Sequence, residues 1–155
     1  WLTMTEIDRI VDQLRRSYEG RAWHGPSVKE LLDGVSSEDA LSKPIKGRHS
    51  IWELVLHMAA WEDAVRRCLE GEQMRSLPPE KDWPPIPDTG VAAWQKAIEI
   101  LESTHRSLVE TTSKFGEGRL DETVPGAQYS FYTMLHGVVQ HDLYHAGQIA
   151  ILKKK

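Results

Sequence analysis

The sequence contains a single cysteine, Cys68, among 155 residues, and this scarcity excludes a fold held together by intramolecular disulfides. A reducing, cytoplasmic setting is therefore the simplest expectation. No apolar stretch approaches the roughly 18 residues that a membrane-spanning helix needs, so we expect no membrane contact. The first residues also lack the basic and then apolar pattern of a signal peptide. Because the chain begins at Trp1, ahead of Met4, we expect either that native residues are missing before Trp1 or that residues were added before Met4.

Positive charge is not in excess either, because 19 Lys and Arg stand against 23 Asp and Glu, for a formal net charge of −4. Nucleic-acid-binding proteins need a clustered Lys/Arg surface to neutralise phosphates, so we expect no nucleic-acid partner. Hydrophobic residues make up 40% of the chain and include six tryptophans, which is enough to build a core and excludes a disordered chain. The length predicts one domain spanning residues 1–155.

Apolar residues recur at steps of three and four along most of the chain, and no run shows the sustained alternation of a strand. This pattern predicts four long amphipathic helices, over about residues 4–20, 50–71, 89–114 and 130–153. Ser50 and Glu53 form a capping box where the second of these begins. The turn-rich segment after the first helix holds at most short helices, near Ser27 and Ser37. Amphipathic helices in one small domain must bury their apolar faces against each other, so we expect an all-α four-helix bundle.

Proline is concentrated in one place, since residues 72–88 hold five of the eight prolines, around Trp83. This composition predicts a long irregular crossover between the second and third long helices. Extended, it would span roughly 50 Å, far more than a tight hairpin needs. We therefore expect the two helices that it joins to run in the same direction. Connections of this length are more often functional, or span the bundle, than slack.

Seven histidines are present, and three of them have spacing that suits a metal site. His141 and His145 are one helical turn apart, which places their side chains on one face. His57 lies on the inward stripe of the second long helix and could supply a third nitrogen from across the bundle. Three imidazoles would leave a fourth coordination position open, as in catalytic metal sites. The alternative is one buried histidine and two half-exposed ones with no metal.

Several other polar residues have both a functional and a structural interpretation. His105 could support the site or act as an alternative ligand, or it could be a core histidine bonded to a neighbour. Asp142 faces inward and could orient a ligand histidine, or it could pair with an Arg or a Trp N–H. Gln148 could bond a metal-bound water or lie solvated at the rim. His24 could line the cavity or cap a chain end, whereas His136 lies about 140° around the helix from His141 and should not join the site.

The remaining candidates favour structural roles. Glu53 could support His57, but its capping role already explains it. Tyr144 lies on the outward side of the last helix, where packing or a dimer contact is expected. Trp61 is expected in the core, and Cys68 is expected to be a small buried hydrophobe and not a nucleophile. His49, like His24, flanks a turn and could line the cavity or cap a chain end.

The segments around these histidines resemble the DinB/YfiT-like family over essentially the whole chain, in order. They are Trp23-His24-Gly25-Pro26-Ser27, the stretch from His49 to His57, and His141-Asp142-Leu143-Tyr144-His145-Ala146-Gly147-Gln148-Ile149. The resemblance implies a four-helix bundle, a homodimer, and a divalent metal held by three histidines. Carried over by position, those ligands are His57, His141 and His145.

The resemblance also implies a range of functions. Some similar proteins are metal-dependent S-transferases that add a low-molecular-weight thiol (bacillithiol, mycothiol or glutathione) to an electrophile, and others are thiol-dependent isomerases or metal-dependent hydrolases. We therefore expect a transferase that acts on a small-molecule substrate. The alternatives are a hydrolase that uses metal-bound water, or a non-enzymatic stress-response or ligand-binding module with a structural metal. All-imidazole ligation suits Zn, Ni, Cu or Fe, of which we expect Zn or Ni.

Overall fold

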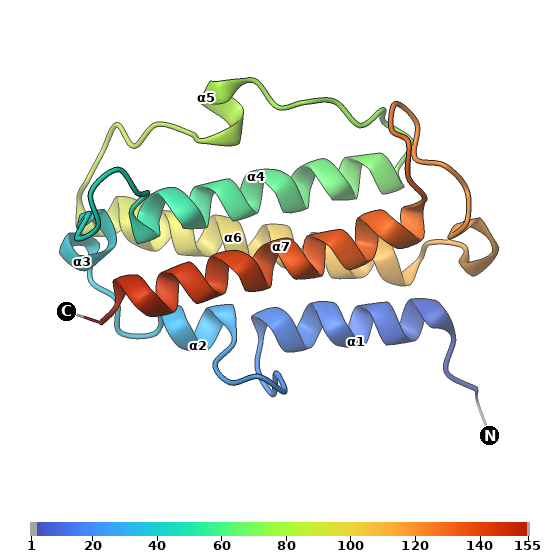
Figure 1. The fold of residues 1–155 in the computed structure, drawn as a ribbon, viewed down its shortest axis with the longest axis horizontal. Helices are drawn as coiled ribbons and strands as arrows, with labels where there is room; N and C mark the ends of the chain where they lie inside the picture. Colours follow the sequence, from blue (N-terminus) through green and yellow to red (C-terminus); the bar gives the residue numbers. More distant parts are fainter. Residues whose placement is uncertain (1–2, 155) are drawn as a thin grey trace.

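The computed structural model describes residues 3–154, and these residues form α-helices and one short 3-10 helix with no sheet (Figure 1). The only β-type pairing among them is an isolated bridge between Thr123 and Ser130. The predicted all-α class is confirmed for this part of the chain. None of the helices described is long and apolar enough to cross a membrane.

Four of the helices are long and coincide closely with the segments predicted from periodicity. They are α1 (Glu6–Tyr18), α4 (Ile51–Leu69), α6 (Val91–Ser113) and α7 (Phe131–Leu152). The short elements are α2 (Val28–Leu32), α3 (Ser37–Leu41), α5 (Pro79–Asp82) and the 3-10 helix η1 (Glu117–Arg119).

Serine side chains fix the points at which two of these helices begin. Ser50 accepts a hydrogen bond from the Glu53 amide, and the Glu53 carboxylate accepts one from the Ser50 amide. Ser27 and Glu30 make the same reciprocal pair at the start of α2. Each capping box satisfies amides that the first helical turn leaves without partners. The beginning of α4 fixes the position of His57 along that helix.

The long helices pack side by side, with α4 against α6 and α7, and α1 against the same two (Figure 1). Figure 1 shows α4 and α6 running in the same direction, with α7 running in the opposite one. The chain between α4 and α6 returns along the outside of α4 and includes the short helix α5. The composition of this crossover had predicted no secondary structure, but Pro79 suits the first position of a helix because it has no N–H to leave unpaired.

The crossover is anchored near its start to the loop that precedes α7. The Met74 amide donates to the Pro125 carbonyl at 2.7 Å. At Gly126, with φ +80°, an added Cβ would lie 2.6 Å from the Met74 carbonyl oxygen. Only glycine allows this close backbone approach without displacement. The anchor holds the start of the crossover against the loop before the helix that carries His141 and His145.

The buried core consists of two apolar clusters separated by polar residues. One cluster includes Trp52, Trp94 and Ile149, and the other includes Leu14, Leu108 and Leu135. Between them along α4, α6 and α7 lie Glu62, His105 and Asp142, which we call the buried polar layer.

Candidate metal centre

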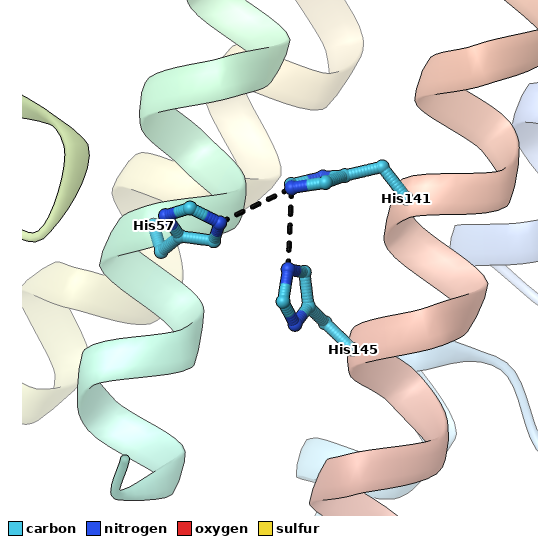
Figure 2. A group of neighbouring side chains, drawn as sticks. All are labelled: His57, His141 and His145. Carbon is cyan, nitrogen blue, oxygen red and sulfur yellow. Dashed lines mark hydrogen bonds between the residues drawn. The ribbon is translucent and has the colours of Figure 1, made fainter. Parts of the chain in front are cut away.

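Three histidine rings from two helices converge on one point (Figure 2). The His57 Nε2 atom, from α4, lies 3.1 Å from the His141 Nε2 atom on α7. The His145 Nε2 atom, one turn further along α7, lies 3.2 Å from the same nitrogen. Nitrogens bound to one tetrahedral ion at about 2.0–2.1 Å would be separated by similar distances. The structure thus brings together the three residues predicted as ligands.

The opposite nitrogens of two rings have partners that fix their tautomers. The His57 Nδ1 atom lies 2.7 Å from the backbone carbonyl oxygen of Asp82, which can only accept a hydrogen bond. The His145 Nδ1 atom lies 2.6 Å from the Gln148 side-chain oxygen, which likewise accepts. Both Nδ1 atoms therefore carry the hydrogen, and both neutral rings present an Nε2 lone pair to the common point.

This arrangement fits a divalent cation by the chemistry of its donors. Two lone pairs are aimed at His141 Nε2, and a single N–H there could not donate well to both. A cation at the common point would accept all three nitrogens. The three imidazoles suit Zn, Ni, Cu or Fe, and no fourth His, Cys, Asp or Glu side chain joins the group within residues 3–154. One coordination position would therefore stay open to a ligand.

Burial favours the neutral form of two of the rings. Desolvation lowers the pKa of His57, although its contacts with Asp82 act in the opposite direction. Desolvation likewise lowers the pKa of His145, against the hydrogen bond to Gln148. A neutral imidazole is the form that binds a metal. The third ring is the one most open to solvent, since 27% of the His141 side chain is exposed.

The crossover contributes residues to this site that the sequence had not identified. The Asp82 carboxylate accepts from the Trp61 indole N–H at 2.7 Å and lies 3.1 Å from His57 Nδ1. The Trp83 ring stacks on the His57 ring, with centroids 3.8 Å apart, and also on the His49 ring, at 3.5 Å. The central tryptophan was noticed from the sequence, but the residues that it contacts were not. The end of α5 thereby supports His57 from the outer side of α4.

The structure distinguishes between the interpretations left open for the polar candidates. Gln148 is not a solvated rim amide but holds the Nδ1 atom of His145. His105 is a core histidine whose Nδ1 atom lies 3.0 Å from the Glu62 carboxylate. Asp142 is fully buried, with its carboxylate 3.8 Å from the His141 Nδ1 atom, and neither atom has a hydrogen-bond partner. Asp142 therefore faces a proposed ligand, at a distance too long for a hydrogen bond.

The other candidates lie outside the three-histidine group. His24 is exposed and lines a separate hollow beside α1, and His136 lies 3.8 Å from Glu6. Glu53 caps α4 and pairs with Lys43. Tyr144 is 67% exposed, as expected for the outward side of α7, and Trp61 is only partly buried because its N–H reaches Asp82. Cys68 is buried, and desolvation raises the pKa of its thiol, which does not suit a nucleophile.

Gln148 offers a test of how the outer partners support the site. Replacing Gln148 with Ala removes the acceptor that holds His145 Nδ1–H, and losses of about 10–100-fold in metal affinity are typical for such partners. We expect Zn²⁺ affinity, measured by competition with a chromophoric chelator, to fall within that range. Gln140→Ala, at an exposed position on the same helix, is the matched control and should leave the affinity unchanged. Equal affinities for both variants would contradict this role.

Comparison with known proteins identifies the family of this chain. No curated protein and no solved structure matches the chain. The family model described as the DinB superfamily matches residues 22–149, which include His57, His141, His145 and the whole crossover. Because this match covers most of the sequence, the chain belongs to the DinB superfamily.

Proposed function

We propose that this DinB protein binds one divalent metal ion, Zn²⁺ or Ni²⁺, through His57, His141 and His145, and transfers a low-molecular-weight thiol to a small electrophilic substrate. The observation that carries the proposal is the convergence of three Nε2 atoms, with no fourth His, Cys, Asp or Glu ligand among the residues that the structure describes. Structural zinc usually takes four protein ligands, whereas catalytic zinc takes three and keeps a position open. We also propose that the four long helices form a four-helix bundle and that the 72–88 crossover forms one wall of the site.

The chemistry that the ion would supply is a lowered pKa for a coordinated thiol, which is then held as a thiolate. The protein's own residues fix the ligands. Asp82 and Gln148 hold the Nδ1 hydrogens of His57 and His145, so both rings keep their Nε2 atoms aimed at the common point. The stacked Trp83 ring covers one face of His57 and limits the access of water there.

A candidate space for a substrate adjoins Gln148, the partner of His145, and none of the three histidines lines it. A cavity of about 280 Å³ lies next to Gln148 and is lined also by Arg48, His49 and Leu54. This volume is near the lower end of the range for small-molecule sites, which combine apolar walls with a few polar groups. It supports a substrate that is small and partly apolar.

In the proposed reaction the thiol sulfur forms a bond to an electrophilic carbon. The bond from that carbon to the leaving group breaks, the leaving group takes the electron pair, and the thiol proton passes to solvent. Monobromobimane is a suitable probe because bromide is its leaving group and its thioether product is fluorescent. Zn²⁺-loaded protein should accelerate product formation from glutathione, bacillithiol or mycothiol above the rate without protein.

Two outcomes, from two assays, would contradict the proposed thiol transfer. One is a rate equal to the background with all three thiols while Zn²⁺ is bound. The other is Zn²⁺-dependent hydrolysis of p-nitrophenyl acetate without any thiol, which would indicate the hydrolase alternative. Chelated protein is the control for metal dependence in both assays.

The proposal includes a homodimer, as the sequence resemblance implies. The exposed side chains Tyr144 and Ile151 support it, because they lie seven residues apart on one face of α7 and are 67% and 61% exposed. Light scattering should give twice the chain mass of 17.7 kDa.

A further inference from the structure

The buried polar layer interrupts the apolar core at one level of the bundle. Glu62 on α4, His105 on α6 and Asp142 on α7 each lie between residues of the two apolar clusters. Glu62 and Asp142 are 0% exposed, and His105 is 2% exposed. Carboxyl groups are almost never fully buried unless they are paired, so this layer needs a physical explanation.

The layer holds more acceptor atoms than the surrounding protein satisfies. Within the layer, the His105 Nδ1 atom lies 3.0 Å from Glu62 Oε1. Four buried atoms make no hydrogen bond of good geometry with the described residues: Glu62 Oε2, His105 Nε2 and both carboxylate oxygens of Asp142. Asp142 faces both the Glu62 carboxyl and His141, and His105 faces the Leu14 carbonyl. One ligand atom from each of the three side chains lies within 4.8 Å of the other two.

No basic side chain neutralises these groups. The ion pairs of residues 3–154 connect neither an Arg nor a Lys to Glu62 or Asp142. Desolvation raises the pKa of Glu62 to about 7. Asp142 is fully buried and faces the Glu62 carboxyl. Two buried carboxyl groups without a cation cannot both be charged, so either protons or a metal ion must neutralise them.

We infer that Glu62, His105 and Asp142 form a second divalent-cation site, inside the bundle and distinct from the three-histidine site. Two carboxylates and one imidazole are hard and borderline donors that suit ions such as Zn²⁺, Fe²⁺ or Mn²⁺. Helical bundles build internal metal sites from carboxylates and histidines that project from facing helices. An ion here would take up the unpartnered oxygens and offset the negative charge. The inference does not depend on the proposed thiol transfer.

The stoichiometry of bound Zn²⁺ tests this site. Because the layer is sealed from solvent, the full chain is unfolded with a chelator, refolded with excess Zn²⁺, desalted and analysed for metal by mass spectrometry. We expect two ions per chain in the wild type. Glu62→Gln, which keeps the side-chain shape, should retain one, and His145→Ala should also retain one. The double variant should retain none.

A matched control and a wild-type measurement keep the test decisive. Glu99→Gln, on the exposed surface of α6, should retain two ions. One ion in the wild type and one in Glu62→Gln would overturn the second site and leave a proton-sharing carboxyl pair in the layer. If the wild type held one ion that Glu62→Gln lost and His145→Ala kept, the second site would stand and the three-histidine site would be overturned. Should Glu62→Gln not fold, Asp142→Asn takes its place, with the same expected numbers of ions.

Discussion

Replacing His145 with alanine is expected to remove one equivalent of bound Zn²⁺ and to abolish thiol transfer, while the protein stays folded. Two imidazoles hold a first-row ion far less well than three. The loss of affinity should therefore exceed the roughly 10–100-fold expected when only an outer partner is removed. The helices themselves depend on apolar burial, which this substitution leaves almost intact. Metal analysis, circular dichroism and the bimane assay measure the three properties.

His136→Ala is the matched control, because His136 lies on the same helix but outside the three-histidine group. It should keep both the metal and the activity. If His145→Ala lost its fold together with its metal, the ion would be required for folding, and chelation should then unfold the wild type as well. Activity that survived both the substitution and chelation would contradict the metal mechanism.

Replacing Trp94 with alanine should cause the largest loss of stability among the substitutions considered. Trp94 is 0% exposed, packs against Trp52 and donates its indole N–H to the Val35 carbonyl at 2.8 Å. Truncation leaves a large cavity and an unpaired carbonyl, and comparable substitutions cost about 3–5 kcal/mol. In urea, where small proteins lose roughly 2 kcal/mol of stability per molar denaturant, the unfolding midpoint should fall by about 2 M.

The control for this loss is Trp23→Ala. Trp23 is 101% exposed, so its removal should change the free energy of unfolding by less than about 0.5 kcal/mol. A midpoint shift of Trp94→Ala no larger than that of Trp23→Ala would contradict the burial of Trp94 in the core.

The helices could be predicted because their signals are local. Ser27 and Ser50 form capping boxes with the residues three positions later, and both mark a helix start in the structure. The long helices differ from the predicted ranges by one or two residues at each end. The short helix α5 was not predicted, since a four-residue helix that begins at a proline has no apolar period to detect.

The candidate site was only partly predictable, for a different physical reason. His141 and His145 are one helical turn apart, and this spacing is visible in the sequence. His57 was a candidate because it lies on the inward stripe of its helix, and the family resemblance then joined it to the pair. Asp82 and Trp83 reach the site through an irregular crossover, and contacts made by such a segment leave no periodic pattern in the sequence. Glu62 had a usable signal, because it is an acidic residue between the buried Met58 and Val65 on α4.

The binding of one divalent ion by His57, His141 and His145 is tested most directly by anomalous diffraction from crystals of Zn²⁺-loaded protein. We expect a zinc peak about 2.0–2.1 Å from the Nε2 atoms of all three histidines. Full occupancy by zinc elsewhere in the molecule, with the three rings ordered and no peak between them, would contradict it.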